Sequence, residues 1–298
     1  MSRAASGAAA EAGSSDMAKI ALMGAGGKMG CRITDNLKLN ASYQIVPVET
    51  GAAGVARLAE RGLSPVPAAQ AVGGADIVVL AVPDILIGKV SHQIVPMLRP
   101  GTLVVGLDPA APLAGVMPDR KDVSFFVCHP THPPLFNDET DPRAQRDWFG
   151  GIAKQDVVCA LFSGAEEHYP VGERLAREMF RPVKDTYRVT VEQMAVLEPA
   201  LVETFSSTLV EALKEGFDEA VRMGVPEPAA RAFFMGHIRI QFAVLFGYAD
   251  FGFSDGAKLA MKLARDLLLK ADWKQKVFDR AAIRRSVQNI VEGMQQPK

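Results

Sequence analysis

The sequence predicts an α/β protein in which a doubly wound parallel sheet is followed by an all-α C-terminal domain. Short apolar runs, typical of strands buried on both faces, alternate with helical patterns as far as residue 189. The first of these runs ends in a cluster of glycines that leads into a helix. From Thr190 onward apolar residues recur at helical spacing, and no strand pattern follows.

The strands are predicted at the apolar runs, and the two N-terminal helices by the 3.6-residue periodicity. In chain order the expected strands are 19–24, 43–49, 75–83, 101–108, 124–130 and 156–164, with helices over 29–39 and 85–98. Residues 1–16 are rich in Ala, Gly and Ser and predict a disordered tail. We therefore expect a Rossmann-type domain over 17–189 and a helical domain over 190–298. Ligands of such a sheet bind beyond the carboxyl ends of its strands.

The helical domain begins with a capping box, in which Thr190 and Gln193 have the required spacing. Its first long helix should stop at Gly224 and Pro226. A second helix is expected from Pro228 to about residue 246, and a further helical region after Ser254 or Asp255.

The first long helix is apolar on more than one side. Met194, Leu197 and Leu209 share one face, whereas Val202 and Val210 lie elsewhere on the helix. A helix with several apolar faces needs several neighbours, which predicts a homodimer formed through this domain.

Composition excludes several classes of function. The 298 residues carry a formal net charge of −1, which argues against a nucleic-acid-binding surface. Three scattered cysteines form no CxxC pair, so a disulfide framework or structural zinc site is not expected, and a reducing cytoplasm is the simplest compartment. No apolar run is long enough for a membrane span, and no secretory signal precedes the fold.

A glycine-rich loop joins the first strand to the first helix and predicts a dinucleotide site. Glycine lets the backbone approach a pyrophosphate closely, and the helix N-terminus offers free N–H groups. The spacing varies from the usual fingerprint, but the strand before it and the helix after it provide the required context. The residues concerned are Gly24, Ala25, Gly26, Gly27, Lys28, Met29 and Gly30.

Acidic residues at strand ends extend this prediction. Glu49 ends the second strand, where a carboxylate would bind the adenosine ribose and repel a 2′-phosphate, favouring NAD over NADP. Its alternative role is a solvated strand-end acid. Val82, Pro83, Asp84 and Asp108 follow later strands and are candidates for the ribose beside the nicotinamide, or for simple turn formation.

The segment after the strand over 124–130 is the candidate chemical site. His129 and His132 flank rigid prolines at the end of the sheet where substrates bind, although surface histidines in a structured loop are the alternative. Glu198 lies at the edge of the apolar stripe of the long helix, beside Pro199, and needs a polar or cationic partner. Glu203 lies opposite that stripe, typical of a solvated or interface position, and His237 is a lone helical histidine, which is more often structural.

The glycine loop, the His129–Asp138 segment HPTHPPLFND and the helical tail together resemble the D-apionate oxidoisomerase family, from about Met17 to the end of the chain. That family is grouped with the β-hydroxyacid dehydrogenases and is similar to ketol-acid reductoisomerase. The resemblance implies that NAD oxidises D-apionate to a keto acid, which rearranges to 3-oxo-isoapionate.

The same resemblance suggests site residues in the helical domain. Where β-hydroxyacid dehydrogenases carry a catalytic lysine and an asparagine, this chain has Glu203 and Ser207. Against ketol-acid reductoisomerase, His237 falls near one metal-binding acid and Glu198 within one position of another. The remaining acids of that two-metal site have no match, which implies a single divalent ion.

The resulting hypothesis is an NAD-dependent oxidoreductase acting on a small polyhydroxy sugar acid. His132 is the candidate base, because imidazole titrates near neutral pH, with Glu203 as the second catalytic candidate. His129 and Glu198 are the candidate metal ligands and His237 a weaker third. Two alternatives stay open: a plain NAD-dependent hydroxyacid dehydrogenase without rearrangement, and a non-catalytic NAD-sensing protein.

Overall fold

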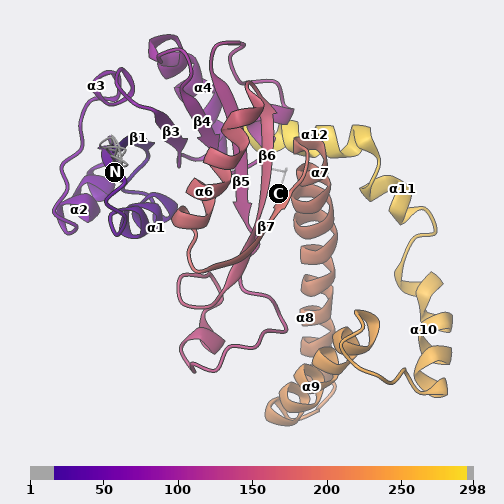
Figure 1. Ribbon diagram of the computed structural model, residues 1–298. Helices are drawn as coiled ribbons and strands as arrows, with labels where there is room; N and C mark the ends of the chain where they lie inside the picture. The colour runs from indigo at the N-terminus through magenta and orange to yellow at the C-terminus, as the bar shows by residue number, and fades with distance from the viewer. Residues whose placement is uncertain (1–16, 294–298) are drawn as a thin grey trace, which may run out of the picture. The chain divides into compact units, whose positions relative to one another are not determined.

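The computed structural model describes residues 17–293 (Figure 1), so the predicted tail over 1–16 lies outside the described residues. The chain divides into two compact units. Within the described residues, one unit ends at Met194 and takes in the chain again from Ile290, and the other comprises Ala195–Asn289.

The first unit is built on one seven-stranded sheet with the order β2-β1-β3-β4-β5-β6-β7. Adjacent strands from β2 to β5 are parallel, and the register pairs Ile20 with both Ile45 and Ile77. The strand order reverses at β1, between β2 and β3, which is the switch point where doubly wound sheets bind ligands. The strands are β1 (Ala18–Met23), β2 (Tyr43–Val48), β3 (Ile77–Leu80), β4 (Leu103–Gly106), β5 (Ser124–Pro130), β6 (Gln155–Ser163) and β7 (Val183–Arg188).

The predicted doubly wound sheet is confirmed, with a difference at its last two strands. β6 pairs antiparallel to β5, and β7 pairs parallel to β6. The reason is the connection: residues 131–154 contain a single 3-10 turn, η2 (Ala144–Arg146), and no crossover helix that would return the chain in the parallel sense. β7 has no apolar run because it is a half-exposed edge strand with the sequence VKDTYR.

Helices cover both faces of the sheet because alternate strand residues point to opposite sides. Ile20 and Leu22 of β1 pack in one core cluster with residues of α1, α2 and α6, whereas Ala21 and Met23 belong to a second cluster with residues of α3 and α4. These helices are α1 (Lys28–Leu37), α2 (Ala52–Ala59), α3 (Ala68–Val72), α4 (Asp84–Ile94) and α6 (Tyr169–Met179), and the short α5 covers Ala110–Leu113. The 3-10 turns η1 (Val95–Met97) and η3 (Glu166–His168) flank two of them.

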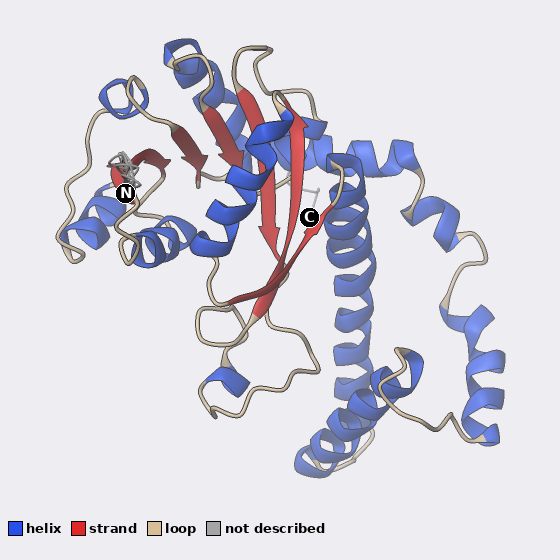
Figure 2. Cartoon of the chain, in the orientation of Figure 1, coloured by secondary structure: helices blue, strands red, loops and turns tan. Residues whose placement is uncertain are grey.

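The chain after Thr190 is helical throughout the described part, as predicted (Figure 2). The capping box is formed: the Thr190 N–H donates to the Gln193 side chain at 2.9 Å, and the Gln193 N–H to the Thr190 hydroxyl at 3.2 Å. Gly224 follows the long helix with φ +99°, as a helix-ending glycine should. The helices are α7 (Val191–Ala195), η4 (Val196–Ser206), α8 (Ser207–Arg222), α9 (Glu227–Leu245), α10 (Asp255–Leu268), α11 (Trp273–Val277) and α12 (Arg280–Glu292).

Pro199 changes the winding of the long helix, as its missing N–H leads one to expect. Val196–Ser206 form a π-helix instead of an α-helix. The Thr204 hydroxyl donates to the Pro199 carbonyl oxygen at 2.6 Å, which satisfies an acceptor there. Among the helices of residues 17–293, none combines the length and the apolarity needed to cross a bilayer.

Candidate active site

The glycine loop lies at the switch point of the sheet, between the end of β1 and the start of α1. Gly24 has φ +74°, and a Cβ there would lie 2.4 Å from the Ala81 carbonyl oxygen, so only glycine fits. Gly27 caps α1 with no side-chain hydrogen bond. The first N–H groups of this helix and its dipole therefore suit an anion such as a diphosphate.

Glu49 lies directly after β2 and is tied to the glycine loop. Its Oε2 accepts from the Gly26 N–H at 3.0 Å, and its Oε1 accepts from the Thr50 and Gly51 N–H groups at 2.9 Å each. Gly54 of α2 packs beneath this carboxyl group, since a Cβ there would lie 2.4 Å from Cδ of Glu49. Backbone N–H groups thus hold the carboxylate beside the glycine loop.

The residues after β3 lie beside the same loop. A Cβ on Gly24 would be 3.1 Å from Cγ1 of Val82, so these two residues are neighbours. Pro83 is the N-cap of α4 and Asp84 its first residue. Asp84 therefore lies where an acid complements the helix dipole.

His129 and Asp108 come together at the carboxyl ends of two adjacent strands. A side-chain oxygen of Asp108 lies within 4.8 Å of a ring nitrogen of His129, so both could ligate one metal ion. Nδ1 of His129 is 2.9 Å from the Leu107 carbonyl oxygen. A carbonyl only accepts, so Nδ1 carries the hydrogen and Nε2 the lone pair, which is the arrangement of a metal-binding histidine.

The electrostatics of His129 fit the same role. Burial lowers the pKa of His129 from its ordinary value, although the Leu107 carbonyl and the Asp108 carboxylate act to raise it. A lowered pKa keeps the imidazole neutral, as a ligand must be. Asp108 also accepts from the Ala110 N–H at 2.7 Å, which fixes its carboxylate at the start of α5.

His132 is exposed and lies in the loop after β5, in a left-handed backbone conformation with φ +62°. Its Nδ1 is 3.1 Å from the Phe149 carbonyl oxygen, so Nδ1 donates and Nε2 carries the lone pair in the neutral ring. This is the form that a general base requires.

Three further candidates belong to the second unit. Glu198 is half-buried in η4, and Glu203 of the same π-helix is exposed. His237 is exposed in the middle of α9, where its Nδ1 lies 2.7 Å from the Phe233 carbonyl oxygen and its ring stacks on Phe233.

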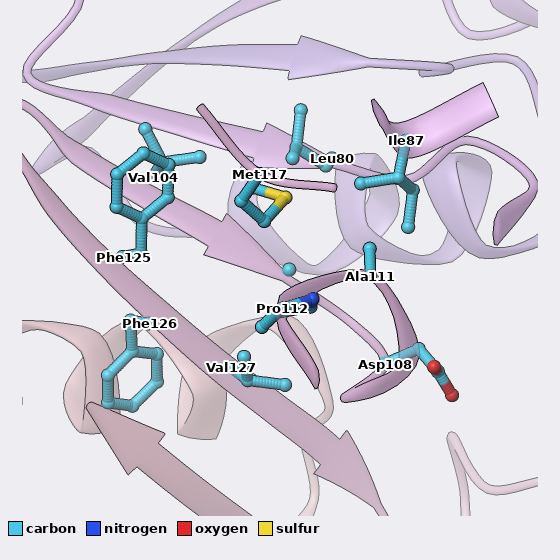
Figure 3. Close-up of a pocket in the computed structure, with 11 residues that line it drawn as sticks. Leu80, Ile87, Val104, Asp108, Ala111, Pro112, Met117, Phe125, Phe126 and Val127 are labelled. Atoms are coloured by element: carbon cyan, nitrogen blue, oxygen red, sulfur yellow. The ribbon is translucent and has the colours of Figure 1, made fainter. Parts of the chain in front are cut away.

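An apolar cavity lies between the sheet and α4, with Asp108 at its edge (Figure 3). Leu80, Val104 and Phe125 are among its lining residues, and the Asp108 carboxylate points away from them. Its volume is about 10 Å³, room for roughly one water molecule, so it is a packing void and not a sugar-acid site.

Comparison with known proteins adds to this geometry. The model of the acetohydroxy acid isomeroreductase NADPH-binding domain matches residues 16–133, and that of the phosphogluconate dehydrogenase (decarboxylating) C-terminal domain matches 137–291. A D-apionate oxidoisomerase of Cupriavidus necator is 49% identical over 274 residues, which cover 91% of this chain and 99% of that protein. One from Rhizobium rhizogenes is 49% identical over 276 residues, 92% of this chain and 100% of that protein. The chain belongs to the D-apionate oxidoisomerase family.

A solved structure supports the same relationship. The semialdehyde dehydrogenase NAD-binding protein from Cupriavidus necator, in complex with calcium and NAD, matches with a TM-score of 0.89 at 49% identity. The match covers 92% of this chain and 99% of that chain. The family predicted from the glycine loop and the HPTHPPLFND segment is confirmed.

Sequence reasoning did not foresee three contributors to the site. Asp108 was expected at the cofactor, but it also lies beside His129. Gly54 and Phe149 belong to no motif, so no local pattern points to either residue. The proximity of Asp108 to His129 could have been predicted, because the strands before them follow one another in the chain. The carboxyl ends of neighbouring parallel strands meet at one edge of the sheet.

Proposed function

We propose that this protein is an NAD-dependent oxidoisomerase that converts D-apionate to 3-oxo-isoapionate. The observation that carries the proposal is the 49% identity to a D-apionate oxidoisomerase along 91% of the chain, which includes both the glycine loop and the histidine segment. The order of the chemistry is an oxidation at the secondary alcohol, followed by migration of one carbon group.

NAD is the proposed cofactor, held by residues 24–30 with its adenosine ribose at Glu49. The tight glycine loop and the uncapped start of α1 fit its diphosphate. A carboxylate at position 49 disfavours the extra phosphate of NADP. The related Cupriavidus necator structure contains NAD. Bound NAD would supply the hydride acceptor, and Val82, Pro83, Asp84 and Asp108 are the proposed contacts near its nicotinamide half.

His132 is the proposed base of the oxidation, with Glu203 as the alternative. As the C2–H hydride leaves, Nε2 of His132 takes the proton of the 2-hydroxyl group, so a 2-keto acid forms. The tertiary alcohol at C3 then loses its proton and becomes a ketone, while a carbon group moves from C3 to C2 and the former C2 carbonyl becomes an alcohol. The sum is D-apionate plus NAD⁺ giving 3-oxo-isoapionate, NADH and one proton.

His129 and Glu198 are the proposed ligands of a single divalent metal ion, with His237 as a weaker third and Asp108 as an addition. The support is the proximity of Asp108 to neutral His129, together with the calcium present in the related structure. Such an ion would polarise the ketone and the neighbouring alcohol during the rearrangement. An imidazole among the ligands suits zinc, manganese or iron better than magnesium.

The enzyme is proposed to act as a cytoplasmic homodimer. Its three cysteines are free thiols, which suits a reducing compartment. The second unit exposes large apolar side chains that single soluble chains rarely show, among them Phe233 at 70% and Leu267 at 83% exposure. An apolar groove of about 250 Å³ between α8 and α9 lies in the same unit, and a second copy would cover these faces.

The deciding experiment follows NADH formation with D-apionate and related sugar acids, and identifies the product by NMR. The proposal requires both NADH and a rearranged carbon skeleton. NADH with an unrearranged keto acid would support the plain dehydrogenase instead, and NAD binding without NADH on a broad panel of acids would support the sensor.

A further inference from the structure

Phe149 connects the cofactor helix to the loop that carries His132. Its carbonyl oxygen accepts from Nδ1 of His132 at 3.1 Å and from Nη1 of Arg32 at 3.2 Å. Arg32 belongs to α1, the helix that begins at the glycine loop. One backbone oxygen thus joins the proposed base to the helix that receives the dinucleotide.

The phenyl ring of Phe149 makes the same connection. The His132 ring lies 5.3 Å from it, centroid to centroid, in a tilted arrangement. On α1, Nζ of Lys28 lies 3.8 Å and Cζ of Arg32 lies 5.3 Å from the Phe149 centroid. A ring in contact with two cations and an imidazole keeps a defined position.

The surrounding loop is built to hold Phe149. The Asp147 carboxylate accepts from the N–H groups of Gly150 and Ile152 at 2.8 Å each and of Ala153 at 3.0 Å. His132 itself has φ +62°, a conformation that a non-glycine residue keeps only where its surroundings impose it. The Thr131 hydroxyl donates to the His132 carbonyl oxygen at 3.3 Å, and the Phe149 contacts hold the His132 ring.

We propose that Phe149 is a positioning residue that fixes the tautomer and orientation of the His132 imidazole relative to the cofactor helix. The inference rests on the proposed role of His132 as the base. Phe149 is not assigned any contact with the substrate. Its effect on the reaction passes through His132, because the base must hold its Nε2 lone pair toward the hydroxyl proton.

The test is a double-mutant cycle between Phe149→Leu and His132→Gln. Phe149→Leu should lower kcat by about tenfold to a hundredfold, the scale of a misplaced catalytic group. KM for NAD should change by no more than about fivefold, since only the ring contacts of Lys28 and Arg32 are lost on that side and the Arg32 bond to the Phe149 carbonyl remains. In the His132→Gln background, Phe149→Leu should have no further effect on kcat. Phe149→Tyr should retain most activity, and Trp148→Leu, at a neighbouring side chain that is 79% exposed, should behave as wild type.

A second measurement does not depend on turnover. The ¹⁵N shifts of the His132 ring, assigned by their absence in His132→Gln, should show a protonated Nδ1 in the neutral ring of both wild type and Phe149→Leu, because the substitution keeps the backbone carbonyl that accepts from Nδ1. The ring resonances should broaden in Phe149→Leu, because the imidazole loses the aromatic contact that holds its orientation. If His132→Gln lowers kcat but Phe149→Leu has the same effect with and without His132, the positioning role is wrong. If His132→Gln keeps wild-type kcat, the base assignment itself fails, and the inference with it.

Discussion

The carboxylate of Glu49 accepts a hydrogen bond from the backbone N–H of Gly26, at 3.0 Å. The acid at the end of β2 and the loop after β1 are therefore one structural feature, with the carboxylate held beside the proposed diphosphate position. A negative charge fixed there would lie next to the 2′-position of the adenosine ribose.

Replacing Glu49 should narrow the cofactor preference. Wild-type enzyme should prefer NAD over NADP, and Glu49→Ser should reduce the ratio of the two kcat/KM values by about tenfold or more, since like charges placed together oppose binding strongly. Glu60→Ser, at an exposed acid just after α2, is the matched control. Equal use of NAD and NADP by the wild-type enzyme would contradict the assignment.

Gly54 should be required for the same function. A Cβ there would lie 2.4 Å from Cδ and 2.6 Å from Oε2 of Glu49, so Gly54→Ala must displace a carboxylate that three N–H groups hold. We expect KM for NAD to rise about tenfold with a smaller change in kcat. Gly51→Ala is the control, because its Cβ would lie at an ordinary 3.4 Å from Oε1 of Glu49. Equal KM values for the two variants would show that this packing does not matter.

Much of the fold could be predicted because its signals are local. The glycine loop, the capping box at Thr190 and the stop at Gly224 each depend on a few consecutive residues. The proximity of Asp108 to His129 depends on the lateral pairing of β4 with β5, which the order of the strands along the chain suggests but no single motif encodes. The contacts of Phe149 could not be predicted from the sequence. Phe149 lies in the irregular segment 131–154, and its partners Lys28 and Arg32 belong to α1, far away in the chain.

Cys159 should make stability depend on alkaline pH. Burial, with a smaller contribution from Glu173, raises the pKa of Cys159 from its ordinary 9.0 to about 12. A group whose pKa is raised on folding contributes stability that is complete below the unfolded pKa and is lost as the pH rises toward the folded one. From pH 8 to pH 10, wild-type protein should lose roughly 1 kcal/mol more unfolding free energy than Cys159→Ala. Urea unfolding of both proteins at pH 8 and pH 10 measures this difference in unfolding free energy. An identical pH dependence for wild type and Cys159→Ala would show that Cys159 has no such effect.

The second unit should mediate dimerisation. Leu267 of α10 is 83% exposed in the single chain, and we expect a partner copy to cover it. Light scattering at micromolar concentration should give twice the 32.0 kDa chain mass. Leu267→Glu should shift the protein toward monomer, because a buried unpaired charge is costly. Leu39→Glu, at a 67% exposed leucine of the first unit, should leave the dimer intact. A monomeric wild-type protein would reject the proposal.

The enzyme should bind one divalent metal ion through His129 and Glu198. His129 presents Nε2 because its Nδ1 bonds to Leu107, and the Asp108 carboxylate lies beside it. Calorimetric titration of the chelator-treated enzyme with Mn²⁺ should show one site, and His129→Ala and Glu198→Ala should each weaken it at least about tenfold. NAD affinity should stay nearly unchanged, since the glycine loop that holds the proposed diphosphate contains neither of the substituted residues.

His168, which lies beside the opposite end of β5 from His129, provides the control. Nδ1 of His168 lies 2.6 Å from the hydroxyl of Ser124, the first residue of β5, so His168→Gln should leave Mn²⁺ binding intact. Chelation should suppress the rearranged product, and added metal should restore it. Full formation of that product by rigorously metal-free enzyme would mean that His129 acts as a hydrogen-bonding group toward the substrate, and that Glu198 is a structural acid.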